Sequence, residues 1–359
     1  MPRHVRVPLR VRRPPRVTVA VLCAALLLGA VAWFVLGGVG TNQAHTGGAA
    51  PDPTGSGAAP AGRLAGWPLF AERSGLATDQ LRRLEAAGRT GEAAAIRRIA
   101  DQPTAAWFAD EAPGYADRAA RLVRAAAAAG QVPVLSVYFV PGRDCSGHSV
   151  GGARDDAAYL RWIGALADAL AGHRAIVVLE PDAVAQAAEG CLDAAAAAAR
   201  YRLLGAAVEA FRAQPGVRVY LDAGNPTWVE PNRMAPALRA SGIDRAHGFA
   251  LNVANFEHTA DNIAYGTALS GLLGGAHFVV DTSRNGNGPA RQGAGDRHWC
   301  NPPGRALGAA PTVETGHPLA DAFLWVKRPG ESDGACTAGA PAAGRWYQRY
   351  ALELAGHRG

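Results

Sequence analysis

The chain has 359 residues and a formal net charge of +6. Six arginines before residue 17 account for that charge, so the remainder is near neutral and carries no basic stripe interleaved with aromatic residues. From this pattern we do not expect the protein to bind nucleic acid. The length beyond the N-terminal region, roughly 300 residues, suits one large domain.

The N-terminal region predicts three segments before that domain. Residues 1–16 form a basic tail, 17–40 an apolar stretch, and 41–63 a linker rich in Gly, Pro and Ala. An apolar stretch of this length behind an arginine cluster is typical of a transmembrane anchor or a signal segment. We therefore expect the domain at 64–359 to be extracellular, either anchored in the membrane or secreted after cleavage.

Short apolar runs alternate with Ala-rich segments along this domain. Strands are predicted at 132–140, 176–179, 217–221, 248–252, 278–280 and 322–326. Helices are predicted at 79–99, 115–129, 156–171, 192–213, 232–241 and 346–354. This alternation predicts an α/β fold with a mostly parallel sheet wrapped by helices.

Five cysteines divide between the two regions. Cys23 lies in the apolar stretch, and the other four lie just beyond predicted strand ends. Pairing in sequence order, Cys145–Cys191 and Cys300–Cys336, would join neighbouring loops in an oxidising compartment. Four free thiols or a zinc site are weaker alternatives, because no Cys-x-x-Cys spacing is present.

Acidic residues stand at or shortly after four of the predicted strands: Asp144, Asp182, Asp222 and Asp281. The carboxyl ends of barrel strands face one side, so we expect these carboxylates to gather there. Paired carboxylates supply the acid and base that cleave a glycosidic bond. Structural alternatives stay open for two of them: Asp182 could instead cap the helical segment that follows it, and Asp222 could cap the turn after its strand.

Seven strings of residues together resemble glycoside hydrolase family 6. They follow that family's order from about residue 107 to the C-terminus: GRDC at 142–145, LEPDA at 179–183, YLDAG at 220–224, NVANF at 252–256, DTSRNGNGP at 281–289, WCN at 299–301 and FLWVKRPGESDG at 323–334. The resemblance implies a distorted, seven-stranded TIM-like β/α barrel with an open active-site cleft. It also implies inverting hydrolysis of β-1,4-glucan without a metal or other cofactor.

The resemblance assigns roles to individual residues. Asp182 matches the general acid, Asp144 the aspartate that supports it, Asp333 the candidate base, and Asp222 an aspartate that holds the hydrogen-bond network. Substrate contacts are implied for Trp107, Tyr138, Ser149, Trp228, Asn255, Trp299, Lys327 and Glu331. Aromatic faces among them would stack on glucose rings. Two further tryptophans, Trp162 and Trp346, are expected in the core.

Three positions depart from the family pattern. Ser149 is followed by Val150, so one hydroxyl expected after Asp144 is missing, and Asn225 and Pro231 stand where many members carry His and fungal members carry Trp. These changes affect subsite affinity and substrate length. The chain is also short between residues 255 and 327 and after 333, which favours an open cleft and internal cleavage. We expect a monomer that acts on a β-1,4-glucan polysaccharide.

Three alternatives remain at this stage. A cellobiohydrolase of the same family would cut from chain ends, and a non-catalytic glucan-binding surface protein would bind without releasing reducing sugar. A metal-dependent hydrolase would use the aspartates with histidines such as His148 and His298, although no His-Glu-x-x-His spacing supports it.

Overall fold

The computed structural model describes residues 63–145, 147, 149–290 and 298–356. All of them belong to one unit of the chain, 56–359. The predicted basic tail, the apolar stretch and nearly all of the linker lie outside the described residues. Within the described part, no helix has the length and apolar character needed to cross a membrane.

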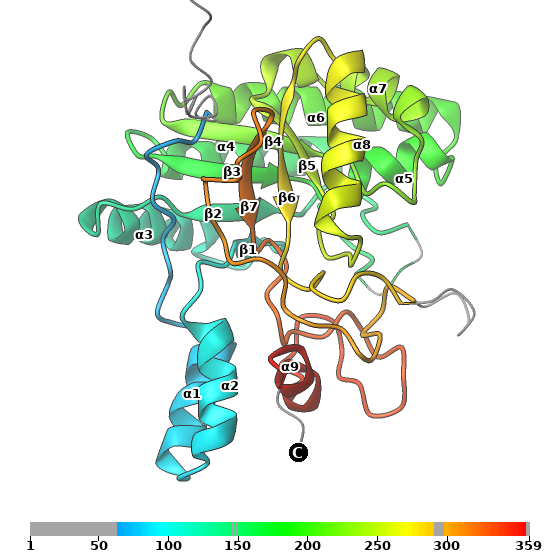
Figure 1. The fold of residues 1–359 in the computed structure, drawn as a ribbon. Helices are drawn as coiled ribbons and strands as arrows, with labels where there is room; N and C mark the ends of the chain where they lie inside the picture. The colour runs from blue at the N-terminus through cyan, green and yellow to red at the C-terminus, as the bar shows by residue number, and fades with distance from the viewer. Residues whose placement is uncertain (1–62, 146, 148, 291–297, 357–359) are drawn as a thin grey trace, which may run out of the picture. The chain divides into compact units, whose positions relative to one another are not determined.

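Seven parallel strands form one sheet, and their spatial order follows the sequence (Figure 1). They are β1 (Ala106–Phe108), β2 (Val134–Val137), β3 (Ala175–Leu179), β4 (Val217–Asp222), β5 (Gly248–Leu251), β6 (His277–Asp281) and β7 (Ala320–Leu324). An isolated bridge between Thr104 and Trp325 joins the two edges of the sheet. The sheet is therefore a curled, incompletely closed barrel, which confirms the predicted seven-stranded fold.

Helices connect the successive strands from β1 to β6 and cover the outside of the sheet (Figure 1). They are α3 (Tyr115–Ala128), α4 (Asp156–Ala169), α5 (Ala183–Glu189), α6 (Ala194–Arg212), α7 (Pro231–Ala240), the 3₁₀ turn η1 (Ile243–Arg245) and α8 (Thr259–Leu272). Before β1, α1 (Leu76–Ala86) and α2 (Thr90–Ala100) form a helical hairpin, and α9 (Gln348–Leu354) contacts α2.

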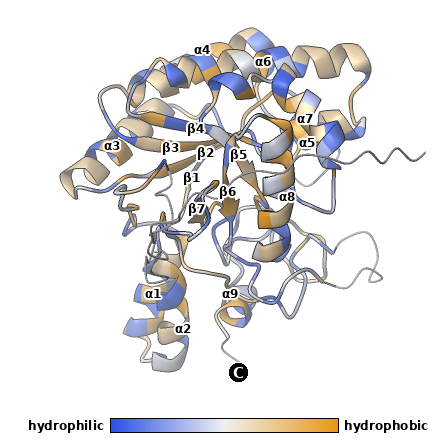
Figure 2. Cartoon of the chain, turned by 45° about the horizontal axis from the view of Figure 1, so that its top comes forward, coloured by the Kyte–Doolittle hydropathy of each residue, from blue (hydrophilic) through white to orange (hydrophobic). Residues whose placement is uncertain are grey.

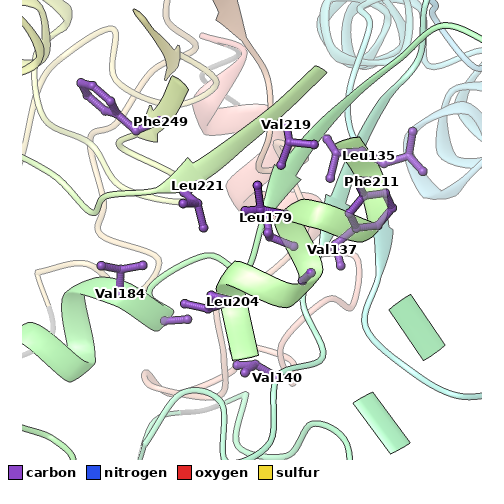
Figure 3. Close-up of a cluster of buried hydrophobic side chains, with 14 of the residues drawn as sticks. Leu135, Val137, Val140, Leu179, Val184, Leu204, Phe211, Val219, Leu221 and Phe249 are labelled. Carbon is purple, nitrogen blue, oxygen red and sulfur yellow. The ribbon is translucent and has the colours of Figure 1, made fainter. Parts of the chain in front are cut away.

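The strands bury both faces because their side chains alternate between two apolar clusters. In β3, Val177 and Leu179 pack toward the surrounding helices, whereas Ile176 and Val178 join the cluster inside the curled sheet. Figure 3 shows the outer layer, where strand side chains meet Phe211 and other residues of the helices. Figure 2 shows the matching pattern of hydrophobic strands and helices with mixed surfaces.

The first described residues close the interior of the sheet. Leu64 and Trp67 belong to the same inner cluster as Val178. Two guanidinium groups, those of Arg174 and Arg218, lie 5.4 and 5.1 Å from the Trp67 ring. Cation–π contacts of this kind hold the indole in place, so the first described residues are part of the core of the domain.

The structure corrects several predicted elements. The single helix expected at 79–99 is two helices, because Gly88 takes a left-handed φ of 67° between them. Three elements, β1, η1 and α8, were not predicted, and α5 entered only as the helical segment that Asp182 could cap. The glycine content of α8 hides its helical pattern, and Gly266 has a packing reason: a Cβ there would lie 2.7 Å from the Phe278 ring.

Candidate active site

A cleft of about 1240 Å³ lies among the loops that follow the strands. It brings together eleven of the twelve predicted catalytic and substrate-binding residues: Asp144, Asp182, Asp333, Trp107, Tyr138, Ser149, Trp228, Asn255, Trp299, Lys327 and Glu331. The twelfth, Asp222, is fully buried and does not line the cleft. The sequence therefore identified residues that are distant along the chain and adjacent in the fold.

Asp182 is presented to the cleft by a tight turn after β3. Pro181 cannot continue the ladder, and Asp182 takes a left-handed φ of 69°. It occupies the N-cap position of α5, yet its side chain makes no capping hydrogen bond, which argues against the capping alternative. Burial, together with the charge of Asp144, raises the pKa of Asp182 to about 7. A carboxyl group that is protonated near neutral pH can act as a proton donor.

Asp222 lies directly behind this turn. Its Oδ1 accepts hydrogen bonds from the backbone N–H of Asp182, at 2.8 Å, and of Gly224, at 3.1 Å. Burial, followed by the charge of Asp182, raises the pKa of Asp222 well above its ordinary range. An ionised Asp182 therefore disfavours the ionisation of Asp222.

Asp144 stands on the loop after β2, in a left-handed conformation with φ 59°. Its Oδ2 accepts a hydrogen bond from the backbone N–H of Ser149 at 2.5 Å. The neighbouring Arg143 donates to the carbonyl oxygens of Ala109, Tyr138 and Ser149. These contacts fix the loop on both sides of Asp144.

Two disulfides fasten loops at the cleft. The structure joins Cys145 to Cys191 and Cys300 to Cys336, the two pairs expected from the sequence. The first links the Asp144 loop to the end of α5, the helix that begins after Asp182. The second links two segments that flank Asp333.

Removing the first disulfide is expected to lower stability. In a Cys145→Ala, Cys191→Ala double variant the unfolded chain regains the freedom of a loop with a sequence separation of 46. The free energy of unfolding should fall by about 2–4 kcal/mol. Chemical denaturation of the oxidised protein and the variant measures this difference, and equal unfolding free energies would contradict it.

Asp333 is held by cations and amides. Arg284 donates to both carboxylate oxygens, at 2.9 and 2.7 Å, and the Lys327 ammonium lies 3.2 Å from Oδ1. The backbone N–H of Asn301 donates to Oδ2 at 2.9 Å. Burial alone would raise the pKa of Asp333, but the two cations and these hydrogen bonds outweigh it and lower the pKa. The same cleft therefore holds one carboxyl group whose pKa is lowered, that of Asp333, and one whose pKa is raised, that of Asp182.

Sequence reasoning missed Arg284 and assigned Asp281 to the wrong group. Arg284 is fully buried and pairs with Asp333, but nothing in its Gly-rich string signals that partner. Asp281 does not reach the cleft. Its carboxylate accepts hydrogen bonds from the backbone N–H groups of Ala254, Ser283 and Lys327, so it fastens three loops together.

Aromatic side chains line the cleft. Trp107 donates its indole N–H to the carbonyl oxygen of Val326 at 2.8 Å and meets Tyr138 edge to face at 5.6 Å. Trp228 donates to Glu189 at 2.7 Å. These bonds fix the ring planes, and flat indole faces suit the apolar faces of sugar rings. The two tryptophans expected in the core differ, because Trp162 is in the core while Trp346 is only half-buried.

The three departures from the family pattern have different surroundings. Val150 lines the cleft with 58% of its surface exposed. Asn225 also lines the cleft, and its Oδ1 accepts hydrogen bonds from both the backbone N–H and the hydroxyl of Thr227. Pro231 begins α7, where a proline is compatible with the helix.

The metal-dependent alternative has little geometric basis in the described part of the chain. No group of three or more His, Cys, Asp or Glu side chains there is arranged to hold a metal ion. His298 lines the cleft, and His148 lies outside the described residues.

A sequence profile of the glycosyl hydrolases family 6 matches residues 65–358, almost the whole described chain. The chain belongs to glycosyl hydrolases family 6. Five of the seven strings in which the sequence resembled this family contribute residues to the cleft: GRDC, LEPDA, NVANF, WCN and FLWVKRPGESDG.

Relatives in this glycosyl hydrolase family carry two kinds of name. Endoglucanase A of Cellulomonas fimi is 44% identical over 281 residues, 77% of this chain and 59% of the relative. A solved endoglucanase from Mycobacterium tuberculosis, in complex with methyl-cellobiosyl-4-deoxy-4-thio-β-D-cellobioside, is 42% identical with a TM-score of 0.77 and covers 82% of this chain and 98% of its own. The probable 1,4-β-D-glucan cellobiohydrolase C of Neosartorya fischeri is 32% identical over 275 residues, 62% of this chain and 61% of the relative. This chain thus spans less than two thirds of the length of either of these curated relatives.

Proposed function

We propose that this protein is an endo-acting β-1,4-glucanase that hydrolyses internal bonds of cellulose or a related β-glucan with inversion. The observation that carries the proposal is the pair of aspartates in one cleft with opposite pKa shifts, raised at Asp182 and lowered at Asp333. Environments that shift the pKa values of two carboxyl groups in opposite directions define an acid and a base. Family membership supplies the reaction class.

In the proposed reaction, Asp182 protonates the glycosidic oxygen as the bond to the leaving sugar breaks. A water attacks the anomeric carbon from the opposite face, and its proton passes to a carboxylate. Asp333 is the proposed acceptor, directly or through further water, and Asp144 supports the proton on Asp182. Asp222 holds the backbone of the acid through its hydrogen bond to the Asp182 N–H.

Substrate contacts follow from the lining of the cleft. We propose that Trp107, Trp228 and Trp299 stack on glucose rings, and that Tyr138, Ser149, Asn255, Lys327 and Glu331 bind hydroxyl groups along the chain. Lys327 would share its ammonium between the sugar and Asp333. No cofactor is needed, so we expect full activity after exhaustive chelation.

The proposed roles predict a bell-shaped dependence of kcat/KM on pH. Asp182 must be protonated, so activity should fall as pH rises through about 7. Asp333 must be ionised, and because its pKa is lowered, activity should fall only at pH values below the ordinary carboxyl value of 3.8. Initial rates on a soluble cello-oligosaccharide measure both limbs. An activity that rises through pH 7 would contradict the assignment of the acid.

Internal cleavage is favoured over chain-end cleavage by the short loops of the sequence and by the endoglucanase names of relatives at 44% and 42% identity. The test follows viscosity and reducing ends together on carboxymethyl cellulose. We expect viscosity to fall steeply for each reducing end formed, compared with a chain-end cellobiohydrolase. An equal or slower fall would support the cellobiohydrolase alternative, and folded protein that binds glucan without forming reducing ends would support a binding protein.

We further propose an extracellular location. Disulfides persist in oxidising compartments, and two are present at the cleft. The apolar stretch at 17–40, preceded by arginines, supports an anchor or a signal segment. Fractionation of cells that express the full chain distinguishes them: membrane-bound protein of full length indicates an anchor, a shortened soluble form indicates cleavage, and cytoplasmic protein would contradict both.

A further inference from the structure

Glu180 is a buried carboxylate that the proposed reaction does not use. It stands two residues before Asp182 at the end of β3 and is fully inaccessible to solvent. Among the described residues, no Lys, Arg or His forms an ion pair with it. A buried carboxylate needs compensating hydrogen bonds, and here backbone N–H groups of the segment that follows β2 donate them.

The contacts of Glu180 lie on the segment that leads from β2 to Asp144. Its Oε1 and Oε2 accept from the backbone N–H of Phe139, at 3.0 and 2.9 Å, and Oε2 also accepts from that of Val140 at 3.0 Å. Glu180 has a left-handed φ of 50°, which non-glycine residues rarely adopt. This conformation accompanies a side chain that reaches β2 while Asp182, two residues on, reaches the cleft.

Arg200 of α6 holds the next two residues of the same segment. It is only 6% exposed, and its guanidinium donates to the carbonyl oxygens of Pro141, at 2.8 Å, and Gly142, at 3.2 Å. Glu180 therefore accepts hydrogen bonds from the start of the segment 139–142, and Arg200 donates hydrogen bonds to its end. Neither side chain lines the cleft.

A shift of this segment would reach Asp144 by a second route as well. The N–H of Ala153 donates to the carbonyl oxygen of Phe139 at 2.8 Å, and a Cβ at Gly152 would lie 1.9 Å from the carbonyl oxygen of Val140. Residues 149–153, the part of the loop that follows Asp144, are thus packed against residues 139 and 140. They include Ser149, whose N–H binds Asp144.

We propose that Glu180 and Arg200 are positioning residues, which together hold the loop of Asp144 at a fixed place opposite Asp182. The acid and its supporting aspartate are then set by one structural unit, because Glu180 and Asp182 belong to the same three-residue turn. This inference rests on the proposed function, since it concerns the geometry of the proposed acid.

The charged and titratable groups that surround Glu180 and Asp182 determine how a variant changes the pKa of each carboxyl group. Those that face Glu180 are Tyr138, Arg143, Tyr159 and Arg200. Those that face Asp182 are Asp144, Asp222 and Tyr138. Burial raises the pKa of Glu180 to about 7, against the pull of the Phe139 and Val140 amides. Kinetics are therefore compared over full pH profiles that extend to both sides of this value.

The test compares Glu180→Gln and Arg200→Met with matched changes on the exposed face of α6, Glu209→Gln and Arg202→Met. In both positioning variants we expect kcat on a soluble cello-oligosaccharide to fall by on the order of tenfold to a hundredfold, with little change in KM. The alkaline limb should move to lower pH, because Asp182 loses part of the charge of Asp144 that supports its proton. The matched variants should behave as the wild type.

The outcomes separate this inference from the proposed function. An inactive but folded wild type contradicts the proposed function alone, whereas an active wild type whose folded variants keep both kcat and the alkaline limb overturns the inference. A lower kcat with an unmoved limb also overturns it, since a merely structural role would give that result. Arg200→Met carries the kinetic test if Glu180→Gln does not fold. Hydrogen exchange of the full chain, without substrate, should find the Phe139 and Val140 amides slow, and fast exchange there would contradict the clamp.

Discussion

Replacing Asp182 with Asn is expected to lower kcat on cello-oligosaccharides by about 10²–10⁴-fold, the usual contribution of a positioned general acid. Asn has nearly the same size and cannot donate a carboxyl proton. The backbone N–H of residue 182 would keep its bond to Asp222, so the fold and KM should change little. Steady-state kinetics on the folded variant measure the loss.

The leaving group provides the control for this prediction. An acidic phenol leaves an aryl cello-oligosaccharide without needing protonation. Asp182→Asn should therefore retain most of its activity on such a substrate. An equal loss on both substrates would indicate that Asp182 acts by another route, such as substrate positioning. Unchanged kcat on the natural type of bond would exclude it as the acid.

Replacing Asp333 with Asn is expected to remove activity and to destabilise the fold together. Arg284 is fully buried, and Asp333 is its partner and that of Lys327. Removing one member of a buried ion pair costs about 3–5 kcal/mol, because the remaining charge is left uncompensated. Chemical denaturation should record a loss of this size in the free energy of unfolding.

The pH dependence of the free energy of unfolding is a second test of the ion pairs of Asp333. The pKa of Asp333 is lowered in the folded protein, so its stabilisation is complete above the ordinary value of 3.8 and is lost as pH falls below it. This acid-dependent loss should be absent from Asp333→Asn. A matched surface change, Asp79→Asn in the exposed pair with Arg82, should alter stability by less than about 1 kcal/mol. Equal effects of the two changes would contradict the buried pair.

The strand ends could be predicted from the sequence because an apolar run that stops at a carboxylate indicates both a buried strand and the point where that strand ends. That pattern placed Asp144, Asp182, Asp222 and Asp281 at one end of the sheet, and the structure agrees. Only Asp144 and Asp182 line the cleft, whereas the carboxylates of Asp222 and Asp281 accept hydrogen bonds from backbone amides. Strand-end position alone does not reveal which way a side chain points.

Partners that are distant along the chain could not be predicted by any local pattern. Arg284 and Asp333 are 49 residues apart, and the contact exists only because the loops after β6 and β7 are neighbours. The clamp of Glu180 on the β2 segment is of the same kind, since it depends on strand pairing. Residues 291–297, next to Trp299, lie outside the described residues.

The anomeric form of the first product tests the central claim most directly. Proton NMR of a cello-oligosaccharide hydrolysed by concentrated enzyme resolves the new reducing end before it equilibrates. Attack by water opposite the leaving group, with Asp182 as acid, predicts that the α-anomer forms first from a β-linked substrate. Initial appearance of the β-anomer would contradict the account, because it would require a covalent intermediate and a different pair of carboxylates.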